Sequence, residues 1–182
     1  MRYKPKEFVL KNGLSCIIKS PGPEDAISML QLMRTASDET DFLARYSDEI
    51  DITVSQEQQF LQNCLKSKKD LMLCALVQGN LVANAGITPI APHQRYAHRT
   101  SFGISINQKY WGLGIGSLLI SAVISSAHEM GYEQLELEVV SGNERGLALY
   151  RKYGFEIYGT RNHAFKYRDG TYASEYLMML KL

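Results

Sequence analysis

Apolar residues alternate with polar ones in some segments of the chain and recur every three to four residues in others, so the pattern predicts both strands and helices. Two apolar runs within residues 6–20 flank Asn12-Gly13, and runs at 71–77 and 81–90 flank Gly79-Asn80. Such pairs between apolar runs are typical of tight hairpin turns. Further strands are expected at residues 101–106, 134–140, 155–168 and 171–180.

Two helices are expected in the first third of the chain. Pro23 suits the first turn of one of them. The residues expected on its buried face are Ile27, Leu30 and Met33. Thr53 and Ser55 each have a glutamine three residues later, which is the spacing of a capping box at the start of the next helix. The buried stripe expected on that helix consists of Phe60, Leu61, Cys64 and Leu65.

Two more helices are expected in the second half. One begins at the glycine-rich residues 112–116 and ends at Gly131, which suits the position just past a helix. A shorter one begins with Asn143 as its N-cap and ends before Gly154. The order of elements predicts a single α+β domain over residues 1–182, with a mostly antiparallel sheet and one parallel βαβ unit.

Composition excludes several classes of function. The chain has 182 residues, of which 45% are hydrophobic and 21% charged, and its formal net charge is +1. A near-neutral chain lacks the basic surface that nucleic acid or an anionic membrane would attract, and no apolar run is long enough to span a bilayer. Cys16, Cys64 and Cys74 show no metal-ligand spacing, and no apolar leader segment precedes them. We therefore expect a cytoplasmic protein without a metal, a nucleic-acid partner or a membrane partner.

The most informative short stretch is KYWGLGIGSLLI, residues 109–120, which has Gly112, Gly114 and Gly116 at the start of a helix. Glycine destabilises a helix, so three of them there need a reason. Unpaired main-chain N–H groups and the helix dipole attract anions to a helix N-terminus, and glycine lets a ligand approach those groups closely. The stretch therefore predicts a phosphate or pyrophosphate ligand.

Two common phosphate-binding motifs fit this stretch less well. An ATP-type P-loop needs Lys-Ser or Lys-Thr at the helix start, whereas Ser117 and Leu118 follow the last glycine. The dinucleotide fingerprint needs its third glycine at Ser117 and a doubly wound parallel sheet. Glu136 or Glu138 lies near the acidic position of that fingerprint, so a dinucleotide-binding oxidoreductase remains a second interpretation.

About residues 100–156 contain FGISINQKYWGLGIGSLLI and LELEVVSGNERGLALYRKYGF, and the two segments together resemble the Gcn5-related N-acetyltransferases, the GNAT superfamily. The resemblance is greatest to the bacterial ribosomal-protein and polyamine acetyltransferases. It implies a sheet splayed around the parallel βαβ unit, helices on both faces, and acetyl-CoA as co-substrate in the gap. It also implies that main-chain groups of Ile104, Ser105 and Ile106 bind the pantetheine arm.

The same resemblance assigns the pyrophosphate of acetyl-CoA to the glycine-rich stretch. The residues that it implies are Trp111, Gly112, Gly114, Ile115, Gly116 and Ser117. Trp111 stands where the family usually has Gln or Arg, and Leu113 stands where a basic residue is common. Both departures remove a side-chain contact and leave the main-chain donors in place.

A second family segment, Asn-x-x-Ala-x-x-Leu-Tyr, matches Asn143, Leu149 and Tyr150, with Gly146 in place of the alanine. The match implies that Asn143 faces the cofactor arm, although an N-cap alone would also explain an asparagine there. It implies that Tyr150 protonates the departing thiolate. A tyrosine packed in the core is the alternative explanation for that residue.

The sequence contains no nucleophile elbow and no Cys–His pair, so we expect direct transfer to an amine within a ternary complex. Some relatives place a glutamate on the strand that here reads LVANAGITPI, and this chain has Asn84 at that place. Asparagine cannot act as a base. Glu138 and His98 are the remaining candidate bases by position, and a chain of water molecules is our preferred route for the proton.

The acceptor is expected to be a small-molecule amine or a protein N-terminus. The polar loop at residues 91–100 and an acidic segment are candidates to border it, and the latter favours a cationic amine. The acidic residues are Asp38, Glu39, Asp41, Asp48, Glu49 and Asp51. A homodimer is expected as one assembly of the chain. A non-catalytic domain that binds or senses acyl-CoA remains a third interpretation, because the glycine-rich stretch alone does not require catalysis.

Overall fold

The computed structural model describes all 182 residues and contains one eight-stranded sheet. The strands are β1 (Lys6–Val9), β2 (Ser15–Lys19), β3 (Leu71–Val77), β4 (Asn80–Pro89), β5 (Arg99–Ile106), β6 (Gln134–Val140), β7 (Glu156–Lys166) and β8 (Tyr172–Lys181). Their order in the sheet is β1-β2-β3-β4-β5-β6-β8-β7. Only β5 and β6 pair in parallel, which confirms the predicted mixed sheet with a single parallel crossover.

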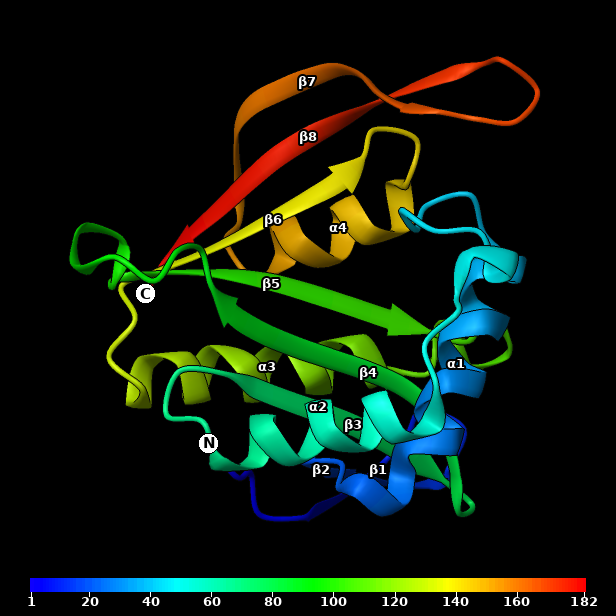
Figure 1. Ribbon diagram of the computed structural model, residues 1–182, viewed down its shortest axis with the longest axis vertical. Helices are drawn as coiled ribbons and strands as arrows, with labels where there is room; N and C mark the ends of the chain where they lie inside the picture. The colour runs from blue at the N-terminus through cyan, green and yellow to red at the C-terminus, as the bar shows by residue number, and fades with distance from the viewer.

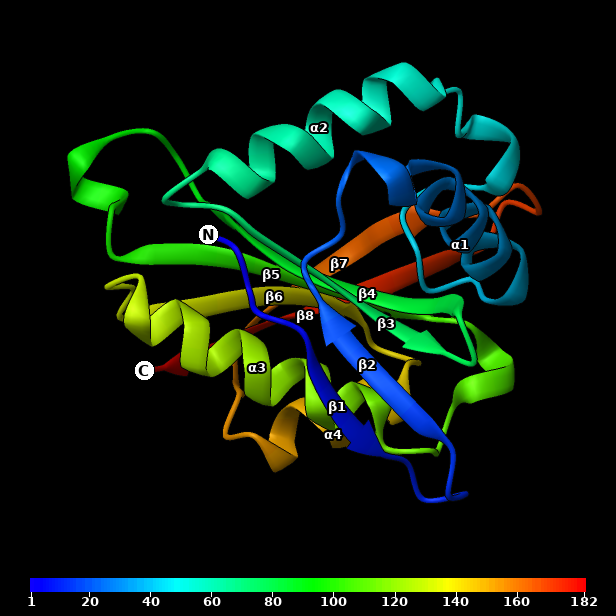
Figure 2. The ribbon, with the colours of Figure 1, turned by 90° about the horizontal axis from the view of Figure 1, so that it is seen from below.

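Four α-helices cover the two faces of this sheet. They are α1 (Ala26–Glu39), α2 (Val54–Lys66), α3 (Ile115–Glu129) and α4 (Glu144–Lys152). Figure 2 shows α1 and α2 on one face and α3 and α4 on the other. The apolar core between α3 and the sheet includes Leu119, Ile120 and Val123, all of them buried. None of the helices combines the length and the apolar character that a bilayer crossing requires.

The sheet splits in the middle. Parallel pairing between β5 and β6 is limited to Arg99, Thr100 and Ser101, which pair with residues 134–136 of β6. Beyond Ser101, β5 continues along β4 while β6 continues along β8, so the two strands diverge toward their C-terminal ends (Figure 1). The predicted splay is therefore confirmed, and it leaves one side of β5 without a strand partner.

The hairpin between β3 and β4 turns one residue earlier than predicted. Gln78 and Gly79 have φ of 51° and 79°, and Asn80 already pairs with Val77. Two successive residues with positive φ form the type I′ turn whose twist matches a hairpin. The sequence predicts Gly79-Asn80 as the two turn residues, because Asn adopts positive φ more readily than Gln. The register of the sheet instead makes Gln78 the first turn residue.

Two apolar faces are also only partly as predicted. In α1 Leu30 is buried, but Ile27 is 58% exposed, because the helix packs on α2 and β4 through Met29 and Leu32 instead. In α2 Leu61 and Cys64 are buried as predicted, whereas Phe60 is 46% exposed. The capping box of Thr53 with Gln56 is present, and the hairpin of β1 and β2 turns at the predicted Asn12-Gly13.

Candidate active site

A cleft of about 970 Å³ opens where β5 and β6 diverge. Its walls come from β4, β5 and β6, from the loop before α3, from α4, and from α1 with the α1–α2 loop (residues 40–53). Ile104, Ser105 and Ile106 all line it, as do Asn143 and Tyr150. The cleft also contains the glycine-rich stretch. The two predicted motifs are therefore brought together in one cavity.

The glycine-rich loop presents a continuous run of free main-chain donors. The N–H groups of residues 112–117 donate no hydrogen bond within the chain, and the first intrahelical bond here is from Leu118 to the carbonyl of Gly114. Gly114 is the N-cap of α3, so these donors lie at the positive end of the helix dipole. Five of these six residues line the cleft, and unpaired N–H groups at a helix N-terminus form a site for a phosphate-containing anion.

The three glycines have different physical reasons. Gly112 and Gly114 have φ of 79° and 99°, a conformation that other residues adopt only with strain. A Cβ on Gly114 would meet nothing within 4 Å, so it would point into open space at the cleft. A Cβ on Gly116 would instead lie 2.8 Å from Cδ2 of Leu149, so this glycine lets α3 pack against α4. Positive φ therefore explains the first two glycines and leaves the cleft open at Gly114, and packing explains Gly116.

The main chain of β5 faces the cleft at alternate residues. The N–H of Asn107 donates to the carbonyl of Val82 on β4 (3.0 Å). Main-chain groups of a strand point to opposite sides at successive residues, so those of Ser105, two residues earlier, also point toward β4. Those of Ile104 and Ile106 point to the open side. Of the three main-chain partners expected for a pantetheine arm, the register therefore supports Ile104 and Ile106 and contradicts Ser105.

Trp111 is fixed at the start of the loop by two contacts. Its indole Nε1–H donates to the carbonyl of Ile106 (2.7 Å). The guanidinium of Arg145, from α4, lies 5.1 Å from the centre of its ring. The residue that departs from the family motif is thus an ordered part of the cleft wall, and it carries a cation from another element.

Tyr150 is 8% exposed and packs with Phe102 and Phe155 in an aromatic cluster. None of the side-chain hydrogen bonds of the chain involves its hydroxyl, and the residue lines the cleft. Burial raises the pKa of Tyr150 to about 12. The ring therefore belongs to the core, while the hydroxyl remains protonated and available to a ligand in the cleft.

Asn143 has the N-cap geometry predicted for it. Its Oδ1 accepts a hydrogen bond from the N–H of Gly146 (2.9 Å). A Cβ on Gly146 would lie 2.8 Å from Nδ2 of Asn143, so the glycine that replaces the usual alanine lets this side chain fold over the first turn of α4. Asn143 also lines the cleft, so its capping and ligand-facing roles are compatible.

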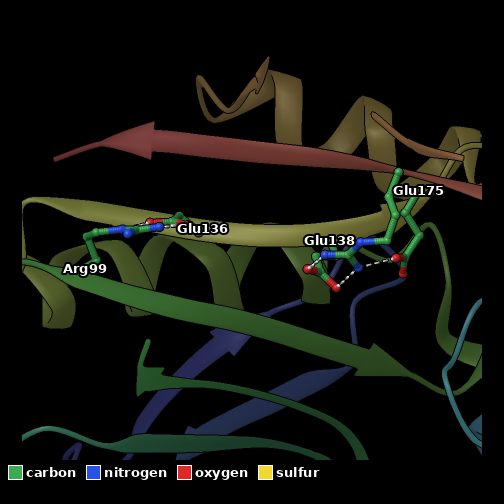
Figure 3. A network of polar contacts seen from close by, with 5 residues as sticks. Arg99, Glu136, Glu138 and Glu175 are labelled. Atoms are coloured by element: carbon green, nitrogen blue, oxygen red, sulfur yellow. Dashed lines mark hydrogen bonds and ion pairs between the residues drawn. The ribbon is translucent and has the colours of Figure 1, made fainter. Parts of the chain in front are cut away.

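Two arginine–glutamate groups lie along β6 where it borders the gap (Figure 3). Near the closed end, Arg99 binds both oxygens of Glu136 (2.5 and 2.7 Å), and this contact lowers the pKa of Glu136. Near the open end, Arg161 of β7 binds Glu138 (2.7 and 3.0 Å) and Glu175 of β8 (2.9 Å).

Glu138 and Glu175 therefore share one arginine, and both line the cleft. Burial, followed by the charge of Glu138, raises the pKa of Glu175. The side chain of Glu138 is 52% exposed, so it is the carboxylate of this group that is open to a ligand. We refer to Glu138, Arg161 and Glu175 as the β6–β8 carboxylate group.

The structure separates the candidate bases. Asn84 lines the cleft opposite Ser105 and makes no side-chain hydrogen bond. Glu138 lines it from β6. His98 does not line the cleft; it precedes β5 near the closed end of the gap. The position of His98 contradicts its candidacy as a base.

Of the two segments predicted to border the acceptor end, the one after α1 lines the cleft, but through side chains other than its acidic ones. None of the six acidic residues between Asp38 and Asp51 lines the cleft. Asp48 forms an ion pair with Arg168, Glu39 accepts from the N–H of Gln108, and Glu49 accepts from the N–H of Tyr46. The side chains of the polar loop at residues 91–100 also lie outside the cleft. The acidic residues stabilise loops, so they do not favour a cationic acceptor.

The far end of the cleft is bounded by two segments that lie against each other. The hydroxyl of Tyr167, in the turn between β7 and β8, donates to the carbonyl of Asp41 in the α1–α2 loop (3.0 Å). The next residue, Arg168, donates its main-chain N–H to the Tyr46 hydroxyl (3.0 Å) and lies 3.9 Å from the centre of that ring. Phe165 and the α1–α2 loop both line the cleft, so this contact joins its two walls.

The charges of the cleft are unevenly paired. Each of its carboxylates has partners: Asp70 accepts from Ser67 and Thr88, and the three glutamates bind Arg99 or Arg161. The cations that line the cleft without an ion pair are Lys11, Arg45 and Arg145. Sequence reasoning missed Arg45, Arg145, Arg161 and Glu175, because no local pattern marks them. The free charge of the cleft is positive, which suits an anionic ligand.

Comparison with known proteins agrees with this geometry. The model of the acetyltransferase (GNAT) family matches residues 31–155. The L-amino acid N-acetyltransferase AaaT of Escherichia coli K12 is 30% identical over 107 residues, which cover 58% of this chain and 65% of that enzyme, less than two thirds of its length.

Solved structures give the same result. A GNAT family acetyltransferase from Streptococcus pneumoniae is similar with a TM-score of 0.88 and 29% identity, covering 92% of this chain and 99% of that one. A phosphinothricin acetyltransferase from Sinorhizobium meliloti, solved in complex with acetyl-CoA, has a TM-score of 0.81 and 16% identity, covering 96% and 89%. The family match over residues 31–155, with the fold and cleft described above, shows that this chain belongs to the GNAT acetyltransferase family.

Proposed function

We propose that this chain is an acetyl-CoA-dependent N-acetyltransferase that transfers the acetyl group directly to the primary amine of a small amino-acid-like acceptor in a ternary complex. The observation that carries the proposal is the run of six free N–H groups that opens into the same cleft as the unpaired Tyr150 hydroxyl. Family membership supports acetyl transfer as the chemistry.

The cleft residues fit acetyl-CoA from one end to the other. The donors of residues 112–117 suit its pyrophosphate, because they are unpaired and the positive φ of Gly114 leaves no side chain in the way. The open main-chain groups of Ile104 and the N–H of Ile106 suit the amides of the pantetheine arm, while the carbonyl of Ile106 accepts from Trp111. When bound, acetyl-CoA supplies an activated thioester carbonyl.

Two groups of the chain serve the transfer itself. The Tyr150 hydroxyl donates its proton to the sulfur as the C–S bond breaks, so that the thiolate leaves as a thiol. Asn84 and Glu138 are the polar groups that face the attacking amine, and we propose that its proton leaves through solvent between them. No histidine lines the cleft, so it holds no Ser–His or Cys–His pair, and the amine attacks the thioester without an acyl-enzyme.

Charge and shape favour a small zwitterionic acceptor. A polyamine carries several positive charges, whereas each glutamate of the cleft is already paired with an arginine, and Glu138, the exposed one, shares Arg161 with Glu175. Arg45 is unpaired at the end where the α1–α2 loop meets the turn between β7 and β8, so it suits an acceptor carboxylate. The E. coli relative is an L-amino acid N-acetyltransferase, which supports this class. A protein N-terminus is the competing acceptor.

The other two interpretations fit the structure less well. A dinucleotide-binding oxidoreductase needs a doubly wound parallel sheet, whereas this sheet has one parallel pair. A domain that only senses acyl-CoA would not need a protonated tyrosine hydroxyl free in the cleft. The single domain over residues 1–182, the homodimer and the cytoplasmic location stay predictions.

A screen of acceptors tests the proposal. Release of free thiol from acetyl-CoA is measured with the twenty L-amino acids, with spermidine and with short peptides. We expect the fastest release with a subset of amino acids. Binding of acetyl-CoA without thiol release from any amine would instead identify a sensing domain, and release with peptides alone would identify a protein N-terminus as the acceptor.

A further inference from the structure

Arg145 is an unpaired cation of the cleft whose guanidinium lies beside the glycine-rich loop. Its Nη1 lies 3.9 Å from the position that a Cβ on Gly112 would occupy, at the first residue of the run of free donors. It forms no ion pair, although Glu144 precedes it on α4. Neither the composition of the loop nor its glycine pattern accounts for a cation here.

The orientation of Arg145 is set by Trp111. The indole is anchored by its hydrogen bond to the carbonyl of Ile106 (2.7 Å), and the guanidinium lies over the ring. This contact uses the face of the guanidinium and leaves the N–H groups at its edge available as donors. Arginine held on an aromatic face loses less side-chain entropy when it binds an anion than a free arginine does.

Trp111 occupies the position where the resembling motif usually has Gln or Arg. The chain has therefore lost the motif's side-chain donor and gained an aromatic platform in its place. α4 supplies a guanidinium to that platform from 34 residues further along the chain, at Arg145. Arg145 therefore supplies a positive charge beside the loop that Trp111 itself does not carry.

We propose that Arg145, oriented by its stack on Trp111, binds the diphosphate of CoA together with the N–H groups of residues 112–117. Trp111 is the positioning residue, and it acts through Arg145. This inference rests on the proposed use of acetyl-CoA. It goes beyond that proposal because it names a side chain from another element as part of the diphosphate site.

The test compares Arg145→Gln with the native chain for binding of CoA and of 3′-dephospho-CoA. Trp111 is the only tryptophan, so its fluorescence reports binding directly, and calorimetry gives the dissociation constant. We expect about tenfold weaker binding of both ligands, because a charge-assisted contact to the diphosphate is lost. The ratio of the dissociation constants of the variant and the native chain should become smaller as ionic strength rises. Arg151→Gln, on the exposed side of the same helix, is the matched control and should bind like the native chain.

Each other outcome overturns part of the account. Weaker binding of CoA with unchanged binding of 3′-dephospho-CoA would show that Arg145 contacts the 3′-phosphate, and it would contradict a contact with the diphosphate. Equal affinity of the variant and the native chain would remove Arg145 from the site. A loss that is independent of ionic strength and accompanied by a lower Tm would indicate a structural role. If the native chain itself bound no CoA, the proposed function would be wrong. The native chain alone decides this, whereas the variant tests only the role of Arg145.

A second variant tests the platform. Trp111→Leu removes the ring, so Arg145 loses its orientation, and calorimetry replaces fluorescence as the readout. In this background we expect Arg145→Gln to weaken CoA binding by about threefold or less, because the two residues act as a unit. A full tenfold effect in the absence of Trp111 would show that Arg145 acts without it.

Discussion

The two ends of the cleft are built from different parts of the polypeptide. The cofactor end consists mainly of main-chain groups: the donors of residues 112–117 and the open side of β5 at Ile104 and Ile106. The acceptor end consists of side chains, among them Arg45 from the α1–α2 loop and the β6–β8 carboxylate group. Main-chain donors need glycine at fixed positions, whereas side chains from distant elements need no local pattern.

That difference explains how selective each end is for its ligand. A row of N–H groups at a helix N-terminus suits any phosphate ester, so the cofactor end accounts for the class of ligand and little more. The acceptor end combines one free arginine with carboxylates that are already bound, and a joined wall of loop and hairpin limits its size. Specificity for the acceptor therefore depends on the end of the cleft that is built from side chains.

The largest effect is expected from Gly114→Val. The new side chain points into the cleft and adds left-handed strain of about 1–2 kcal/mol. We expect acetyl-CoA affinity to fall by about 100-fold or more in calorimetry. Gly131→Val is the matched control, because Gly131 also has positive φ (81°), has open space around it and lies outside the cleft. It should lose similar stability and bind normally; a similar loss of affinity would contradict the comparison.

The next largest effect is expected from Tyr150→Phe. The ring and its aromatic neighbours remain, and the hydroxyl has no partner to lose, so Tm should change little. We expect kcat to fall by about 100-fold with acetyl-CoA affinity unchanged, because a proton donor to the thiolate is removed. Tyr132→Phe loses a hydrogen bond to the carbonyl of Lys69, and because neither residue lines the cleft this variant should keep its kcat. Normal turnover of the Tyr150 variant would return this residue to a purely structural role.

At the acceptor end we expect a smaller effect from Arg45→Gln. KM for an amino-acid acceptor should rise by about tenfold, because a charge-assisted contact to its carboxylate is lost, while acetyl-CoA affinity stays the same. The contrast sharpens when the acceptor is replaced by the corresponding amino-acid amide, for which the variant and the native chain should have equal KM. Arg95→Gln, in the exposed loop outside the cleft, is the control. An equal rise for acid and amide would contradict a carboxylate contact.

The pH profile should show the smallest change. Tyr150 must be protonated to donate, so its contribution is lost as pH rises through its pKa. Because burial raises that pKa to about 12, kcat should not decline between about pH 8 and pH 10.5. A tyrosine with an ordinary pKa near ~10 would begin to lose activity within this range. Initial rates at saturating substrates measure the profile, and a descending limb centred near pH 10 that Tyr150→Phe abolishes would contradict the raised pKa.

The same contrast governs what could be predicted from sequence. Strand and helix order, the cap at Asn143 and the glycine-rich loop follow from local signals, the splay follows from the family resemblance, and all are present. Ser105 was misassigned because only the register shows which residues of β5 face the gap. The reason for Gly116, contact with Leu149, lies on another helix.

Acceptor-side residues could not be predicted because their roles depend on tertiary partners. The acidic segment after α1 suggests a site for cations, yet Arg168, Tyr46 and Gln108 take up its charges and acceptors from positions that sequence spacing does not reveal. Arg161 and Glu175 are ordinary alternating residues of β7 and β8 until the strands pair. Physical reasoning from one sequence therefore reaches the main-chain half of the site and not the side-chain half.

The central claim is that the free donors of residues 112–117 bind the pyrophosphate of acetyl-CoA, and calorimetry of the native chain tests it most directly. Acetyl-CoA and NADH are titrated at the same concentrations, and free CoA is added as a competitor. We predict saturable binding of acetyl-CoA, competition by CoA because the phosphate contacts are shared, and no binding of NADH. Preferential binding of NADH, or no binding of acetyl-CoA, would contradict the account.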